Sequence, residues 1–288
     1  MAEALAAPRR APLAGDGLTL FESRDLRMVF FGPRPVGARR VVVAFAPFDA
    51  PFVPADGGWG HAALAKRGIA HVCVLHRDPD WYQNATFFRA MAACREALGP
   101  ACAITAYGFS MGGYGALLGA ATLGADRAVA ISPQVTIDPS VPPHETRFRA
   151  QWQAMGPWQH DLAAAMDDAR TYVVLYDPLH RRDRRHEALI ARRAGYTRCL
   201  IHGAGHAGIQ ALVQMDAIEP LFDLLAGTAR PADLRQAYRA ARPRGFRYLR
   251  KVGTLLHARD HPMAATYRSH AQAQGFHRLL KRWDAPRP

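Results

Sequence analysis

The sequence predicts a doubly wound α/β fold around a mostly parallel sheet, for three reasons. Between about residue 20 and residue 228, short runs of Val, Ile, Leu and Ala alternate with helix-like segments, as in folds that cover both faces of a sheet with helices. The runs are almost continuously apolar, which is typical of parallel strands buried on both faces. The 288 residues are 49% hydrophobic and 21% charged, an ordinary globular composition in a chain long enough to bury a sizeable core.

Six apolar runs are the expected parallel strands: residues 41–47, 69–76, 103–108, 127–132, 171–177 and 198–203. Helices are expected between and after them, at residues 61–66, 86–98, 113–123, 184–194 and 207–225. Residues 21–33 are expected to add one or two antiparallel strands at an edge of the sheet.

Two segments depart from this alternation. Residues 135–168 contain four prolines and three large aromatic residues between two expected strands, and long insertions of this kind are usually functional or disordered. We therefore predict a small lid there. After Pro231 the pattern becomes helical throughout. The expected organisation is an α/β domain at residues 1–228, with its lid insertion at about 135–168, and a basic helical extension at residues 229–288.

The net charge of +13 is concentrated in the extension, which holds 14 Lys and Arg against three Asp. A basic surface can contact an acidic protein, a membrane surface or nucleic acid. We do not expect nucleic-acid binding, because no recognised motif accompanies the charge and the interleaved aromatic residues fit the apolar face of packed helices. A protein contact through residues 229–288 stays open.

The sequence lacks the patterns of membrane, secreted and metal-binding proteins. No apolar run approaches the ~18 residues that a membrane-spanning helix needs, and the first residues do not have the basic and then apolar segments of a secretory signal. The four cysteines are scattered and lack metal-ligand spacing. We therefore expect a cytoplasmic protein with reduced cysteines, no metal ion and no cofactor.

The run Gly-Phe-Ser-Met-Gly at residues 108–112 lies directly between an expected strand and an expected helix. A strand that enters and a helix that leaves force a sharp turn, which lifts the hydroxyl of Ser110 above the edge of the sheet. The alternative is an ordinary glycine-rich turn that cradles a phosphate at a helix N-terminus. The lysine of a phosphate-binding loop is missing, so Ser110 is the predicted nucleophile.

A serine hydroxyl needs a base to take its proton. His206 follows the last expected strand, after the small residues 203–205, in a loop that can return its imidazole to the serine. His202 is the alternative, but it lies within the strand, where a histidine is more often a hydrogen-bonded core residue. We predict His206 as the general base on the chain order of such sites.

Two aspartates compete for the role of the acid that orients this histidine. Asp177 ends the strand at 171–177, whereas Asp183 lies among four arginines and fits an N-cap for the following helix. A side chain at a strand tip is held more firmly than one in a charged run. We therefore favour Asp177 and keep Asp183 as the second choice.

An oxyanion hole needs two backbone N–H groups. The first is expected from Met111, directly after the nucleophile. The second is expected from the loop after residues 41–47. Pro47 has no N–H, so Phe48 is the earliest residue of that loop that can donate.

The order Ser110, Asp177 and His206, each after a strand, resembles the α/β-hydrolase superfamily over roughly residues 20–228. In that family the acid is frequently found in an Asp-Pro-Leu stretch such as residues 177–179. The family's His-Gly pair near the oxyanion hole is absent here, which puts the second donor in doubt. The resemblance implies a serine hydrolase that acts on ester bonds through an acyl-enzyme.

Three shorter stretches resemble a bacterial sub-group of that superfamily: GFSMGGYGAL, the Trp-Tyr-Gln of residues 81–83 and the Ile-Ser-Pro-Gln of residues 131–134. Some members occur beside surface-polysaccharide functions, which keeps a carbohydrate-linked ester among the expected small-molecule substrates. Trp81 and Tyr82 are equally consistent with lining a substrate pocket and with anchoring the next helix.

Gln134 and Arg147 are further candidates for substrate binding. Ligands of open α/β sheets gather at the carboxyl ends of the strands, where Gln134 ends a strand and Arg147 follows in the predicted lid. A guanidinium recognises carboxylate or phosphate, so an ester with an anionic group is one expectation. The alternative is that Arg147 faces solvent.

Two other functions use the same sequence features. An acyltransferase would use the same triad and the same acyl-enzyme with another acceptor than water. A catalytically idle hydrolase scaffold would act as a binding module through its basic helical tail. An intact triad favours the esterase.

Overall fold

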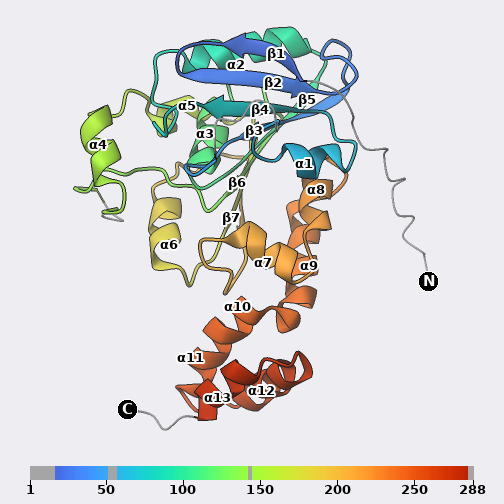
Figure 1. Ribbon diagram of the computed structural model, residues 1–288, viewed down its shortest axis with the longest axis vertical. Coiled ribbons are helices and arrows are strands. Elements are labelled where there is room, and N and C mark those ends of the chain that lie inside the picture. The colour runs from blue at the N-terminus through green and yellow to red at the C-terminus, as the bar shows by residue number, and fades with distance from the viewer. Residues whose placement is uncertain (1–16, 51–56, 142–144, 285–288) are drawn as a thin grey trace.

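The computed structural model describes residues 17–50, 57–141 and 145–284. Its centre is an eight-stranded sheet in the order β1-β2-β4-β3-β5-β6-β7-β8 (Figure 1). The strands β3 to β8 pair in parallel, while β1 and β2 add antiparallel pairs at one edge. The predicted fold class, a doubly wound and mostly parallel sheet, is confirmed.

The strands lie close to the expected runs. Their bounds are β1 Leu18–Glu22, β2 Leu26–Phe31, β3 Arg40–Phe45, β4 His71–His76, β5 Ala103–Phe109, β6 Arg127–Ile131, β7 Thr171–Tyr176 and β8 Tyr196–Leu200. Successive side chains of a strand point to opposite faces. In β3, therefore, Val41, Val43 and Phe45 join the core on one face, and Val42 and Ala44 join the core on the other.

Different helices cover the two faces. The first face carries α2 (Phe87–Leu98) and α3 (Met111–Gly119). The second carries α1 (His61–Ala65), α7 (Gly208–Gln214) and α8 (Glu219–Leu225). The short helix α6 (Arg181–Ala188) follows β7 and contacts it.

The single helix expected at residues 207–225 is broken into α7 and α8. Asp216 adopts a left-handed backbone with φ of 51°, and the N–H of Ala217 donates to the carbonyl of Leu212 at 2.9 Å. This bond closes the end of α7 in the manner of a Schellman motif. The chain then restarts at Glu219 in a new direction.

The insertion at 135–168 contains two short helices, α4 (Arg149–Met155) and α5 (Leu162–Ala165). Phe148 and Trp152 pack against the core on the side of α2 and α3. Pro142 and Pro143 lie outside the described residues. A lid function of this insertion stays a prediction.

From Pro231 to Asp284 the chain is described as helices and turns without a strand. Helix α9 (Pro231–Ala241) contacts β8 and α8, and the turn η2 (Arg242–Arg244) follows it. A continuous helical rod then comprises α10 (Phe246–Tyr248), the π-helical turn η3 (Leu249–Gly253) and α11 (Thr254–His257). Helices α12 (Ala264–Ala273) and α13 (His277–Asp284) complete a small cluster below the sheet (Figure 1).

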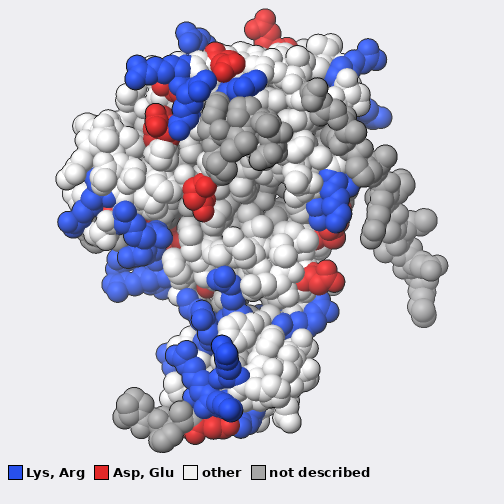
Figure 2. Space-filling model, viewed as in Figure 1, with Lys and Arg blue, Asp and Glu red and all other residues white. Residues whose placement is uncertain are grey.

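This extension has its own small core, which consists of Tyr248, Leu249, Ala271 and Leu279. On the face that Figure 2 shows, Lys and Arg gather on one side of this extension, beside uncharged residues on the other. None of the helices in the described part of the chain is both long and apolar enough to cross a membrane. The four cysteines are buried and unpaired. The residues on which the expectation about a secretory signal rests, 1–16, lie outside the described residues.

The start of α3 packs directly on the main chain at the end of β3. A Cβ added at Gly112 would lie 2.1 Å from the carbonyl oxygen of Phe45 and 3.0 Å from that of Ala46. One at Gly108 would lie 2.0 Å from the carbonyl oxygen of Gly112. Both glycines are therefore required by backbone contacts that no rotation of a side chain can relieve.

We expect Gly112→Ala to lower the free energy of unfolding by about 3 kcal/mol or more, at or above the upper end of ordinary overpacking. Gly37→Ala is the control: Gly37 has a positive φ of 86° and open space around it, so only backbone strain of about 1–2 kcal/mol is expected. Denaturant unfolding measures both variants. Equal losses would contradict the proposed contact.

Candidate active site

The backbone at Ser110 has the shape that a nucleophile turn requires. Ser110 has φ of 56° and ψ of −118°, a left-handed conformation that a residue with a side chain rarely adopts. The turn is held because the Ser110 N–H donates to the carbonyl of Ile131 at 2.9 Å. Strain of this kind persists where the surrounding structure fixes it and often marks an active site.

The structure brings Ser110 and His206 together. The His206 Nε2 lies 3.0 Å from the Ser110 Oγ, and the serine is buried while the imidazole stays partly accessible. His206 stands in the loop after β8, where Gly203 and Gly205 have positive φ angles of 78° and 68°. These two glycines bend the loop back over the sheet edge. His202, the alternative base, uses its carbonyl to accept a hydrogen bond from Tyr238.

Asp183 is the acid that contacts the histidine. Its Oδ1 lies 2.8 Å from the His206 Nδ1, and its side chain is 2% exposed. Burial by itself raises the pKa of this carboxyl, but the hydrogen bonds from His180 and His206 outweigh burial and hold the pKa well below its usual range. The carboxylate is therefore charged and able to orient the imidazole.

The preference for Asp177 is not supported by the geometry. Asp177 is fully buried, and its two carboxylate oxygens accept hydrogen bonds from the N–H groups of Gly203 and Gly205 at 3.0 and 2.9 Å. A residue at the strand tip is held firmly, as expected, but it holds the backbone of the loop instead of the imidazole.

The interpretation of Asp183 as a helix N-cap is also corrected. Helix α6 begins at Arg181, its N-cap is His180, and Asp183 lies within the first turn. The helical period places Asp183, His186 and Glu187 on one buried face, while three of the four arginines are exposed. Helix α6 thus turns its arginines mostly to solvent and its other polar side chains to the buried side, where Asp183 contacts His206.

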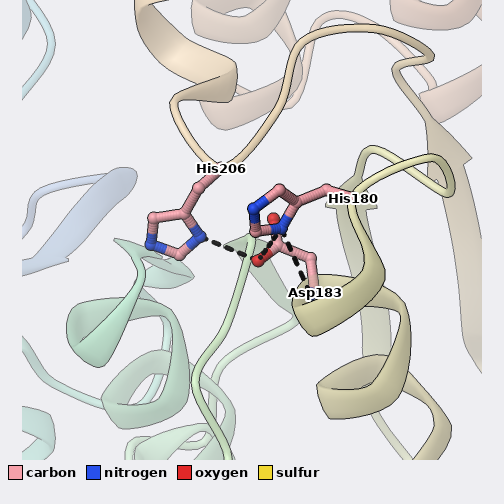
Figure 3. Close-up of side chains that lie close together, drawn as sticks. All are labelled: His180, Asp183 and His206. Carbon is pink, nitrogen blue, oxygen red and sulfur yellow. Dashed lines mark hydrogen bonds and ion pairs between the residues drawn. The ribbon is translucent and has the colours of Figure 1, made fainter. Parts of the chain in front are cut away.

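His180 is a residue of this site that the sequence did not point to. Its Nδ1 lies 2.9 Å from the Oδ1 of Asp183, and Figure 3 shows that the imidazole rings of His180 and His206 both approach that carboxylate. The ligand atoms of these three residues lie within 4.8 Å of one another, close enough to hold a metal ion. Both Nδ1 atoms, however, are at hydrogen-bond distance from one oxygen, and the His206 Nε2 faces the serine, so the carboxylate is placed to orient the imidazole toward Ser110.

The place of each side chain in the topology decides the fold family. Ser110 follows β5 on a strained turn into α3, Asp183 follows β7, and His206 follows β8. These are the positions and the chain order of the nucleophile elbow and its partners. The chain has the α/β-hydrolase fold.

No protein-family model and no curated protein matches the chain. Among solved structures, it is similar to a serine hydrolase without a lid from Xanthomonas campestris, with a TM-score of 0.42, 17% identity, and coverage of 81% of this chain and 96% of the other. It is similar to an esterase from Thermogutta terrifontis with a TM-score of 0.49 and 15% identity, covering 75% of this chain and 96% of the other. A bacterial brefeldin A esterase has a TM-score of 0.45 and 16% identity, covering 82% and 81%.

In this α/β-hydrolase fold, the expected oxyanion donors lie on adjacent segments. Met111 is the first residue of α3, so its N–H has no acceptor within the helix. The loop after β3 forms a turn closed by the Ala50 N–H and the Pro47 carbonyl at 3.1 Å, and this turn does not use the N–H of Phe48. The contact of Gly112 with Phe45 brings the two segments together.

Gln134 lies at the nucleophile. Its backbone N–H donates to the Ser110 carbonyl at 3.1 Å. Its Oε1 lies 3.0 Å from the Ser110 Oγ, as an acceptor that competes with the His206 Nε2 for the single hydroxyl proton. The side chain is fully buried, and its Nε2 has no partner among the described residues. Gln134 is therefore placed to contact the serine and a group bound to it.

Trp81 and Tyr82 are fully buried, which favours their interpretation as anchors over one as pocket residues. Tyr82 donates its hydroxyl to the Ala46 carbonyl at 2.7 Å. The Trp81 ring lies 5.6 Å from the ring of Phe48 and 4.9 Å from that of Phe148. Trp81 and Tyr82 therefore both pack against the segment that carries Phe48.

Arg147 already has a carboxylate partner. Its guanidinium donates from Nε and Nη2 to the two oxygens of Glu145, at 2.9 and 2.6 Å. Burial raises the pKa of Glu145, but these hydrogen bonds lower it overall to about 2. The pair occupies the fork that an anionic substrate would need, so the structure does not support Arg147 as a free anion receptor.

We expect Asp183→Asn to lower kcat for ester hydrolysis by roughly 10⁴, the loss seen when a triad histidine takes the wrong tautomer. Asp216→Asn is the matched control, because Asp216 is exposed and in a left-handed conformation that Asn tolerates. Asp177→Asn should lose far less than Asp183→Asn. The reverse ranking of these two variants, measured by steady-state kinetics, would return the role to Asp177.

Proposed function

We propose that this protein is a carboxylesterase that works through an acyl-enzyme on Ser110. The proposal rests on one observation: a hydrogen-bonded series runs from the Ser110 Oγ to the His206 Nε2 at 3.0 Å and from the His206 Nδ1 to the Asp183 Oδ1 at 2.8 Å. The solved structures to which the chain is similar are named as a serine hydrolase and as esterases, which is the class of activity proposed here.

In the proposed reaction, the Ser110 Oγ attacks the carbonyl carbon of the ester while its proton passes to the His206 Nε2. Asp183 stabilises the imidazolium that forms, and the N–H groups of Met111 and Phe48 donate to the oxyanion. Cleavage of the ester bond expels the alkoxide, which takes the proton from His206. Water then attacks the acyl-enzyme with His206 as its base, and the carboxylic acid leaves.

A mostly apolar cavity of about 740 Å³ is within the ~300–1,000 Å³ of small-molecule sites. None of the reacting residues lines it, but the ring of Phe109 in its wall lies 5.1 Å from the ring of His206. Its walls come from the same three loops as the reacting groups: Pro47 and Asp49 flank Phe48, Phe109 precedes Ser110, and Ile209 follows His206. The lining also includes Trp59, Ala63, Tyr107, Val213, Ile218 and Phe222, together with Arg67, whose guanidinium is already paired with Glu219. This lining supports an ester with an apolar acyl or alcohol group more than an anionic one.

Water is the proposed acceptor, and transfer to a sugar hydroxyl would pass through the same acyl-enzyme. The two are separated by the products: an esterase releases the free acid at a rate that added glycerol or monosaccharide does not lower. An acyltransferase would divert most of the acyl group to the added alcohol.

Ser110→Ala is expected to abolish ester hydrolysis, since loss of a triad serine can cost about 10⁶ in kcat. The wild type should react with a fluorophosphonate probe at one site per chain, and mass spectrometry should find the label on Ser110. Ser132→Ala, at a buried hydroxyl near the site that the proposed reaction does not use, should still be labelled. A wild type that hydrolyses no ester and takes no label would refute the proposed function.

We also expect kcat/KM for a hexanoate ester to exceed that for the acetate at least about tenfold, since each buried CH₂ contributes about 0.8 kcal/mol. Ala63→Phe should fill part of the cavity and remove this preference while sparing acetate. Ala62→Phe is the matched control, because Ala62 is the exposed neighbour on α1. If both variants keep the wild-type preference, the cavity does not hold the acyl chain.

A further inference from the structure

We infer that the C-terminal helical extension is part of the catalytic machinery, with Asp177 and Lys251 as positioning residues for His206. The inference rests on the proposed function, because it concerns the base of that reaction. It replaces the view of the extension as a separate binding module. Two contacts of the extension with the loop after β8 carry it, together with one contact with Asp177 and one with the end of α7.

The first step is the grip of Asp177 on the loop that carries the histidine. The Asp177 Oδ1 accepts from the Gly203 N–H at 3.0 Å, and its Oδ2 accepts from the Gly205 N–H at 2.9 Å. Gly205 directly precedes His206. Both glycines have positive φ angles, a backbone that is flexible unless it is held. The carboxylate therefore fixes the position of the backbone from which the His206 side chain projects.

The second step is the charge that stabilises this carboxylate. Asp177 is fully buried, and a buried charge is costly unless it is paired. The Lys251 Nζ lies 3.7 Å from the Asp177 Oδ2, and Lys251 belongs to η3 in the extension. Such π-helical turns within a helix are frequent at functional sites. The extension thus supplies a counter-charge to the residue that holds the loop.

The third step is direct contact of the extension with the same loop. A Cβ added at Gly203 would lie 2.9 Å from the Cα of Tyr248, so the rod of residues 246–257 packs on the loop backbone. The Tyr238 hydroxyl, on α9, donates to the His202 carbonyl. Residues 202, 203 and 205 are therefore each held by the extension, directly or through Asp177.

The extension is itself fixed to the α/β domain away from this loop. Leu234 and Tyr238 of α9 are buried in the core on the side of α7 and α8. The Arg244 guanidinium donates to the Met215 carbonyl at 3.0 Å, at the end of α7. Because α7 begins two residues after His206, the extension grips both ends of the segment that carries the base.

The experiment compares three variants of the full-length chain. Lys251→Met removes the charge and keeps the apolar stem, Lys251→Arg keeps the charge, and Lys281→Met removes an exposed charge elsewhere in the extension. We expect Lys251→Met to lower kcat on the order of 10- to 100-fold with KM unchanged, as small misplacements of a catalytic group do. Lys251→Arg should restore most of this loss, and Lys281→Met should match the wild type.

Hydrogen exchange gives a readout that does not depend on activity. The amides of Gly203 and Gly205 should exchange faster in Lys251→Met than in Lys281→Met, while those of β5 should not change. If Lys251→Met fails to fold, Tyr238→Phe serves as the test, since it removes only the hydrogen bond to the His202 carbonyl.

Two results would overturn the inference. One is a Lys251→Met variant with the kcat and the exchange rates of Lys281→Met. The other is faster exchange at Gly203 and Gly205 without a loss of kcat, which would make the contact merely structural. Failure of the proposed function looks different: the wild type itself would then neither hydrolyse esters nor take the fluorophosphonate label.

Discussion

The arrangement of the whole site depends on the close approach of β5 and α3 to the carbonyl groups at the end of β3. Gly108 and Gly112 permit this approach because a Cβ at either position would collide with main-chain oxygens. The approach forces Ser110 into its left-handed backbone and sets the first amides of α3 beside the loop of Phe48. The turn at Ser110 and the place of the proposed oxyanion donors thus depend on one packing contact.

Asp183, the carboxylate that contacts His206, comes from a helix whose buried face is polar. In α6, Asp183, His186 and Glu187 share a side that is closed to solvent. Burial lowers the pKa of His186 to about 4, so this imidazole is neutral near Asp183 at physiological pH. The charge of Asp183 is instead stabilised by His180 and His206. A buried polar cluster around Asp183 thus holds the orientation of one imidazole, and departures from an apolar core of this kind are expected at functional sites.

The extension connects this chemistry to the C-terminal part of the chain. It carries Lys and Arg side chains on its surface (Figure 2), and Tyr238 and Tyr248 contact residues 202 and 203. These contacts reach the backbone of the loop that carries His206. A displacement of the helical rod would therefore displace the loop as well. Asp177, at the strand tip, is the point where the two parts of the molecule meet.

The sequence by itself predicted the sheet and singled out Ser110 and His206, because apolar periodicity and the glycines around Ser110 are local signals. It did not determine the acid. Asp177 and Asp183 differ by six positions, and both can reach the end of β8 in sequence terms. Which of the two contacts the imidazole depends on where α6 begins and which side of that helix faces His206. The four arginines around Asp183 gave no sign in the sequence that one side of α6 is buried and polar. Only the tertiary structure decided this, because burial of a helix face is set by what packs against it, and not by the residues of that helix alone.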